Sequence, residues 1–102
     1  TNSQKMMMDA LANAQRVSEK TIIAAACWEC GLDFTPYFLD FVKLATHSDF
    51  QLALEALSVV ESIEGVIDEK KLTEALQIAQ SGEKSDTNLI HDLIENIKSR
   101  IA

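Results

Sequence analysis

The sequence of 102 residues predicts a single all-α domain, residues 1–102, of about six helices paired in three antiparallel hairpins. Apolar residues recur with a helical period throughout, and no stretch shows the strict apolar–polar alternation of a half-buried strand. Only three glycines and one proline occur, which favours long regular elements over many turns. Hydrophobic residues make up 47% of the chain and charged residues 25%, a composition typical of a globular domain with one hydrophobic core.

The first predicted hairpin contains helices at about residues 3–16 and 19–31. The first of these helices includes three consecutive methionines, whose flexible side chains pack adaptably. Ser18 can cap the second helix, and Gly31 is a typical stop signal. The body of the second helix, TIIAAACWEC, is almost wholly apolar. This helix is therefore expected either to be covered on both sides or to offer one face to a partner.

The second predicted hairpin contains a helix at about residues 36–46, started by Pro36, and the central helix of the domain at 48–64. Ser48 can cap the central helix, and Gly65 follows its last turn. Its apolar residues are Phe50, Leu52, Ala53, Leu54, Ala56, Leu57, Val59, Val60 and Ile63. They cover more than one stripe of the helix, so we expect this helix to pack against neighbours on two sides.

The third predicted hairpin contains a helix at about residues 68–80, capped by Asp68, and a last helix from about residue 87. The connecting loop, residues 81–86, is the most polar stretch of the chain. The last helix carries a regular apolar stripe with i, i+3, i+4, i+7 spacing. The stripe consists of Leu89, Ile90, Leu93, Ile94, Ile97 and Ile101.

The charge balance restricts the kind of partner. Nine basic residues are scattered among sixteen acidic ones, for a formal net charge of −7. Binding to nucleic acid or to an anionic membrane needs clustered Lys and Arg, so neither is expected. No apolar run approaches the roughly 20 residues of a membrane span. A protein or peptide partner is expected to be basic. The two cysteines and the absence of a signal-peptide pattern favour a reducing compartment, the cytoplasm.

The motif CWEC, from Cys27 to Cys30, is the one stretch that resembles a chemical site. A redox CxxC needs the positive end of a helix to stabilise its thiolate, but this pair lies at the predicted C-terminal end. A zinc site would need further ligands, and His47 and His91 are isolated. We therefore expect two buried structural cysteines, no metal or cofactor, and no enzymatic activity.

The second helices of the three hairpins share a pattern of apolar residues. The residues that lie 30 positions before Leu52, Ala56 and Val60 are also apolar, and so are those that lie 37 positions after them. The counterparts are Ile22, Ala26 and Cys30 in the first hairpin, and Leu89, Leu93 and Ile97 in the third. Each of these helices also follows another helix and a short connection, which suggests an internal repeat.

Residues 35–64, TPYFLDFVKLATHSDFQLALEALSVVESIE, resemble a short HEAT repeat of about thirty residues. The resemblance lies in Pro36 near the helix start, the aliphatic run that follows, Asp49 in the turn and the small Ala56 in the second helix. Ala53 replaces the arginine that commonly joins neighbouring repeats. The resemblance implies an α–α superhelix that presents a binding surface, with an irregular helical bundle as the alternative.

The repeat pattern also predicts a binding face on the second helices. The face combines one aromatic residue with acidic and polar ones, a composition suited to a basic, apolar peptide. Its residues are Trp28, Gln51, Glu55, Ser58, Asp92 and Glu95. The other interpretation places the side chain of Trp28 in the hydrophobic core, because tryptophan is highly buried on average. The predicted function is a non-catalytic protein-interaction or scaffolding module. The alternative is a bundle that homodimerises through the first helix and TIIAAACW.

Overall fold

The structure is a computed structural model that describes residues 2–82 and 87–101. Within these two ranges the chain forms six α-helices, one 3₁₀-helix and no strand, which confirms the predicted all-α class. The elements are α1 (Asn2–Asn13), α2 (Val17–Glu29), η1 (Thr35–Tyr37), α3 (Phe38–His47), α4 (Phe50–Ser62), α5 (Glu69–Gln80) and α6 (Thr87–Ser99).

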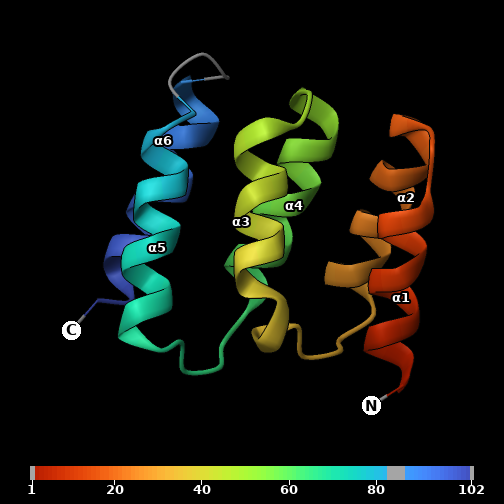
Figure 1. The fold of residues 1–102 in the computed structure, drawn as a ribbon, viewed down its shortest axis with the longest axis horizontal. Helices are drawn as coiled ribbons and strands as arrows, with labels where there is room; N and C mark the ends of the chain where they lie inside the picture. Colours follow the sequence, from red (N-terminus) through yellow and green to blue (C-terminus); the bar gives the residue numbers. More distant parts are fainter. Residues whose placement is uncertain (1, 83–86, 102) are drawn as a thin grey trace.

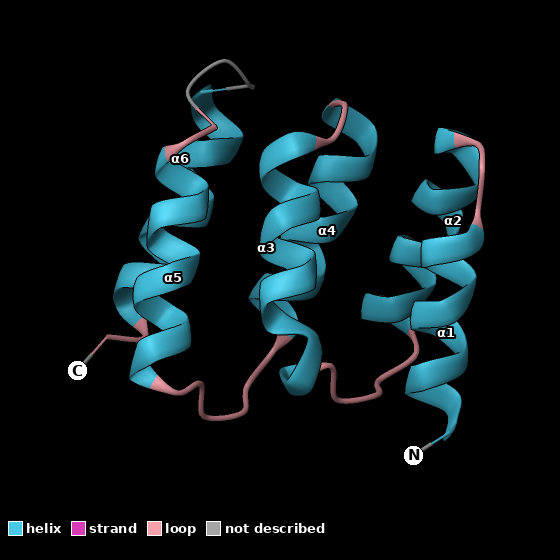
Figure 2. Ribbon diagram, in the orientation of Figure 1, coloured by secondary structure: helices cyan, strands magenta, loops and turns pink. Residues whose placement is uncertain are grey.

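Three antiparallel hairpins stand side by side, α1 with α2, α3 with α4, and α5 with α6 (Figure 1). The first helices, α1, α3 and α5, form one layer, and the second helices, α2, α4 and α6, form the other. The loops gather at the two ends of the helices (Figure 2). The domain measures 31 × 29 × 18 Å, and its shortest dimension matches two layers of helices that are each about 10 Å across. None of the described helices is both long and apolar enough to cross a lipid bilayer.

The helix α4 lies at the centre and packs against α2, α3 and α6, as its broad apolar surface predicts. Ala56 and Val60 are completely buried in this helix. Two of the residues that were predicted to pack against neighbouring helices are exposed instead: Phe50 is 55% exposed and Leu54 is 43% exposed. The reason is that α6 covers α4 less extensively than α2 and α3 do. The side of α4 that faces α6 therefore keeps apolar surface in contact with solvent.

Aspartates cap two of the helices. The carboxylate of Asp49 accepts a hydrogen bond from the backbone N–H of Leu52 at 3.2 Å, so the cap of α4 is Asp49 and not Ser48 as predicted. The carboxylate of Asp68 accepts one from the N–H of Lys70 at 3.0 Å, which confirms the predicted cap of α5. Both carboxylates also place negative charge at the positive end of a helix dipole.

The starts of α2 and α3 differ from the prediction. Arg16 occupies the N-cap position of α2 without a side-chain hydrogen bond, so Ser18 lies inside the helix. Gly31 follows the end of α2 with φ of 75°, a conformation that glycine adopts without strain. Pro36 is the second residue of the 3₁₀ turn η1, and the α-helix proper starts at Phe38. The predicted boundaries are therefore shifted by one to three residues.

The loop between α4 and α5 passes close to the start of α3. The helix α4 ends at Ser62, so Gly65, predicted as its stop signal, lies in this loop instead. A Cβ on Gly65 would collide with the side chain of Thr35, so glycine permits the close approach. The hydroxyl and N–H of Thr35 both donate to the carboxylate of Asp33. These hydrogen bonds lower the pKa of Asp33.

Arg100 joins the second and third hairpins. Its Nη2 donates to the carbonyl oxygens of Val60, at 2.7 Å, and Ile63, at 2.8 Å. Its Nε donates to Oδ1 of Asn96 at 2.9 Å, and its guanidinium lies 5.4 Å from the ring centroid of Phe38. Burial lowers the pKa of Arg100. The guanidinium thus satisfies carbonyl groups at the C-terminal end of α4.

The first hairpin is attached to the others mainly through α2. Of the helices described, α3 and α5 pack together in the first layer, whereas the backbone of α1 approaches only that of α2 (Figure 1). The side-chain amide of Gln4 donates to the carbonyl of Asp33, which ties α1 to the loop before α3. Leu11 is 5% exposed and reaches the core. This arrangement leaves a cleft between α1 and α3.

The packing residues predicted from the repeat pattern are buried in α6 but exposed in α2. The three predicted packing residues of α6, Leu89, Leu93 and Ile97, are all buried. In α2, by contrast, Ile22 is 70% exposed, and Ala26 and Cys30 are also exposed. The buried residues there are Ala24 and Cys27. The buried alanine of α2 is therefore Ala24, two residues before the predicted counterpart of Ala56.

Candidate functional site

The outer side of α4 forms the middle of a surface strip. Gln51, Leu54, Glu55 and Ser58 recur at helical spacing on this side, away from α3. Gln51 and Leu54 are exposed, while Glu55 and Ser58 are half-buried. The hydroxyl of Ser58 donates to the carbonyl of Leu54 at 3.1 Å, so it bonds within its own helix. We call the outer surface of α2, α4 and α6 around this strip the outer face.

Trp28 and Glu55 meet across α2 and α4. The indole N–H of Trp28 donates to Oε2 of Glu55 at 2.6 Å. Trp28 is 40% exposed, so its ring is neither in the core nor free in solvent. A hydrogen bond to a carboxylate is among the stronger ones in proteins, and it fixes the position of the ring. Two of the predicted site residues are thus in direct contact.

The helix α6 supplies the opposite border of the outer face. Asn88, Asp92 and Glu95 follow one another at i, i+4 and i+7 and are all exposed. A groove of about 270 Å³ runs between α4 and α6 beside the first two of them. Its lining residues are Phe50, Leu54, Leu57, Asn88, Leu89 and Asp92. Because Leu57 and Leu89 are buried, the floor of the groove is apolar, and Asp92 provides a charged edge.

Of the residues that line this groove, only Asp92 is among the predicted site residues. The exposed residues that the prediction missed are Phe50, Leu54 and Asn88. The sequence does contain a signal for them. Phe50 and Leu54 lie one turn apart on α4, and the neighbouring turn of α6 offers polar Asn88 and Asp92 in place of apolar partners. Apolar side chains that face polar ones across a helix pair remain in contact with solvent.

The charge of the outer face is negative. The helix α4 contains no Lys, Arg or His, and it contributes Glu55 to the face. The helix α6 adds Asp92 and Glu95. No described basic residue forms a salt bridge with these carboxylates. The face therefore combines an apolar groove and one fixed aromatic ring with acidic side chains that form no salt bridge within the described residues.

The two cysteines lie in different environments. Cys27 is buried, as predicted, whereas Cys30 is exposed, so the prediction is wrong for Cys30. The thiol of Cys30 donates to the carbonyl of Cys27 at 3.4 Å. Burial, and to a lesser extent the neighbouring Cys30, raise the pKa of Cys27 to about 11. No three His, Cys, Asp or Glu side chains within residues 2–82 and 87–101 are grouped so that they could hold a metal ion.

Alkylation with iodoacetamide should distinguish the two thiols. At about pH 8 the raised pKa leaves on the order of one Cys27 in a thousand as thiolate, so we expect it to react about tenfold or more slowly than Cys30. The difference should shrink as the pH rises towards 11, because Cys27 then ionises. Peptide mapping by mass spectrometry measures both rates, and concentrated guanidinium chloride serves as the control in which they become equal. Equal rates in the native protein at about pH 8 would contradict the prediction.

Comparison with known proteins adds no relative from which a function could be transferred. The chain matches no protein-family model, no curated protein and no solved structure. What the structure establishes is an all-α domain of six helices within its described residues.

Proposed function

We propose that this domain is a non-catalytic protein-interaction module that binds a basic, partly apolar segment of a partner on the outer face of α2, α4 and α6. The observation that carries the proposal is the groove between α4 and α6. Phe50 and Leu54 expose large apolar side chains there, 55% and 43% respectively, beside the carboxylate of Asp92. Exposed apolar surface rimmed by polar residues is typical of a protein-binding site.

The chemistry of the face favours a basic amphipathic helix. Two apolar side chains one turn apart can receive the apolar stripe of such a helix, as in other helix-in-groove complexes. Its Lys or Arg side chains would then lie near Asp92 and Glu95. Trp28, held by Glu55, adds an aromatic residue of the kind enriched in binding hot spots.

The resemblance of residues 35–64 to a short HEAT repeat supports a scaffolding role. Stacked helical hairpins of that kind expose one layer of helices as a continuous binding surface. The arrangement of α2, α4 and α6 in one layer agrees with this proposal. The close match is limited to the second hairpin, so a regular superhelix and an irregular bundle both remain compatible with the proposal.

Titration with model peptides, followed by two-dimensional NMR, tests the proposal. We expect a helical Leu/Lys peptide to shift the Trp28 indole signal and the amides around Leu54 and Asp92. A Leu/Glu peptide with the same apolar pattern should not do so. Leu54→Asp should weaken binding about tenfold or more, because it places a charge in the apolar groove. The matched control is Val66→Asp, which changes a 95% exposed apolar residue outside the groove. Equal binding of both peptides, or no effect of Leu54→Asp, would overturn the proposal.

A second candidate function is homodimerisation through the first hairpin. The observation in its favour is the exposure of Met6, at 69%, and Ile22, at 70%, on α1 and α2. Sedimentation velocity over a range of protein concentrations distinguishes the two functions. A dimer that is lost in Ile22→Asp and kept in Leu54→Asp would favour this second candidate. A monomer at all concentrations would exclude it.

A further inference from the structure

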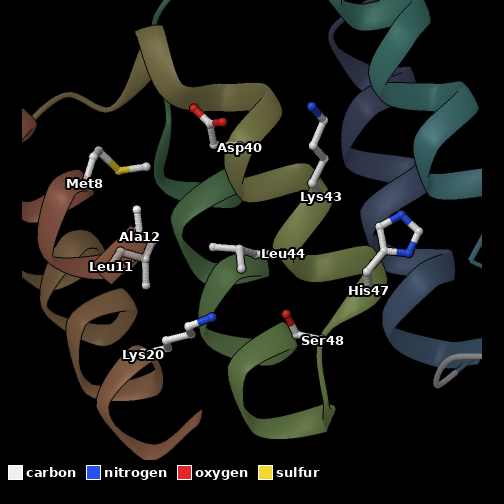
Figure 3. Close-up of a pocket in the computed structure, with 9 residues that line it drawn as sticks. All are labelled: Met8, Leu11, Ala12, Lys20, Asp40, Lys43, Leu44, His47 and Ser48. Atoms are coloured by element: carbon white, nitrogen blue, oxygen red, sulfur yellow. The ribbon is translucent and has the colours of Figure 1, made fainter. Parts of the chain in front are cut away.

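A cleft of about 340 Å³ opens between α1 and α3, on the layer of first helices (Figure 3). It is separate from the groove between α4 and α6 and shares no residue with it. Its lining combines apolar, basic, acidic and hydroxyl side chains from three helices and from the residue that follows α3. The lining residues are Met8, Leu11, Ala12, Lys20, Asp40, Lys43, Leu44, His47 and Ser48.

The middle of the cleft is apolar. Leu44 points from α3 towards Leu11 and Ala12 of α1, and Met8 lies at one end (Figure 3). Leu44 and Met8 are only partly buried, although both pack against the core. The incomplete burial follows from the separation of the α1 and α3 backbones. An aliphatic ligand that filled this space would remove apolar surface from water, which is favourable.

The end of the cleft opposite Met8 carries positive charge. Lys20 reaches from α2 into the space beside Leu44 and Ser48 (Figure 3). Its side chain is half-buried, yet it forms no salt bridge or hydrogen bond with any described residue. Lys43 and His47 also line the cleft, but both project from α3 on the side away from α1, and Lys43 lies near Asp40 rather than near Lys20 (Figure 3). The lining as a whole has an excess of basic groups, in a chain whose net charge is −7.

We infer that this cleft binds a small aliphatic monocarboxylate. The carboxylate would lie against the ammonium of Lys20 and the hydroxyl of Ser48, and the alkyl chain would follow Leu44 towards Met8. Near Met8 the cleft is lined by Asp40 as well as Lys43, so their charges offset each other there, and Lys20 is left at the other end as the cation that forms no salt bridge with any described residue. This charge arrangement selects a ligand with one charged end and an uncharged tail.

The size of the cleft favours a small molecule over a docked helix. Its volume of about 340 Å³ lies near the lower end of the range for small-molecule sites. The lining extends over about two turns of α3, from Asp40 to His47, but over only about one turn of α1, from Met8 to Ala12, so one wall of the cleft is short. A docked helix uses anchors spread over two or more turns on a longer groove.

NMR of the methionine methyl groups tests the inference, with octanoate as the probe below its micellar concentration. We expect a saturable shift of the Met8 methyl and none of the Met6 methyl, because Met6 is 69% exposed outside the cleft. Octanol and octyltrimethylammonium have the same alkyl chain without the negative charge. They should bind about fivefold or more weakly, since neither can pair with Lys20.

Two matched lysine variants complete the test. Lys20→Gln should weaken octanoate binding about fivefold or more, whereas Lys70→Gln, at an exposed position of α5, should leave it within about twofold. Circular dichroism confirms that each variant is folded, and the comparison of the three octyl compounds needs no variant. Equal affinity for octanoate and octanol, or no effect of Lys20→Gln, would overturn the inference. So would a Met8 shift with an acidic peptide but not with octanoate.

Discussion

Replacing Ala56 with leucine is expected to lower the free energy of unfolding by about 3 kcal/mol. Ala56 is completely buried in α4, the helix that packs against α2, α3 and α6. The larger side chain has no free space, so neighbouring side chains must leave their preferred rotamers or the helices must move apart. Urea-induced unfolding followed by circular dichroism measures the change.

Ala26→Leu is the matched control for this prediction. The repeat pattern in the sequence pairs Ala26 with Ala56, but Ala26 is exposed. We expect its replacement to change the free energy of unfolding by less than about 0.5 kcal/mol. Ala24→Leu, at the buried position of the same helix, should behave like Ala56→Leu. A loss of stability at Ala26 as large as that at Ala56 would show that the packing register of α2 is wrong.

Replacing Arg100 with alanine is expected to lower the free energy of unfolding by about 2 kcal/mol. The variant removes charge-assisted hydrogen bonds to the carbonyl groups of Val60 and Ile63. These carbonyls lie at the end of α4, where the usual i+4 partners run out, although Val60 also accepts a hydrogen bond from the N–H of Ile63 at 3.2 Å. The contact of the guanidinium with the ring of Phe38 is lost as well. Urea-induced unfolding again provides the measurement.

Two further variants separate the role of the guanidinium from that of positive charge. Lys98→Ala removes an exposed cation from the same end of α6 and should change stability by less than about 0.5 kcal/mol. Arg100→Lys keeps the charge but not the planar group with several donors, so it should restore only part of the loss. If Arg100→Ala and Lys98→Ala had the same effect, the hydrogen bonds of Arg100 would contribute nothing measurable.

The fold could be predicted because its signals are local. Four residues of the stripe predicted for α6 are buried, whereas Ile101 lies after the end of the helix and is 37% exposed. The buried ones are Leu89, Ile90, Leu93 and Ile97. Asp68 caps α5 as its position before an apolar pattern predicts. When two capping residues are adjacent in the sequence, the wrong one can be chosen. The cap of α4 is Asp49, whereas Ser48 was expected. Such errors shift a boundary without changing the element.

The packing face of α2 could not be predicted for a physical reason. Its body, TIIAAACWEC, is apolar around most of the helix, so helical periodicity does not distinguish a buried side from an exposed one. The packing of α2 against its neighbours α1 and α4 decides which side is buried: Ala24 and Cys27 are buried, while Ile22 is left in solvent. The hydrogen bonds of Arg100 likewise join residues about 40 positions apart, which no local pattern encodes.

The candidate site was predicted in part. Trp28 and Glu55 were expected on one face, and their hydrogen bond shows that they are neighbours. The apolar groove was missed, because Phe50 and Leu54 were both assigned to packing between helices. Whether an apolar residue at the edge of a helix is covered depends on how closely the next helix approaches, and that distance is a property of the whole stack.

The helix α2 contributes to both sides of the molecule. Lys20 lines the cleft beside α1, and Trp28 lies on the outer face, eight residues and about 12 Å further along the same helix. A ligand in the cleft that displaced α2 would therefore also move the indole away from Glu55. Thermodynamic linkage makes such an effect reciprocal, so a partner on the outer face would change the affinity of the cleft by the same factor. The helix α2 would then couple ligand binding in the cleft to partner binding on the outer face.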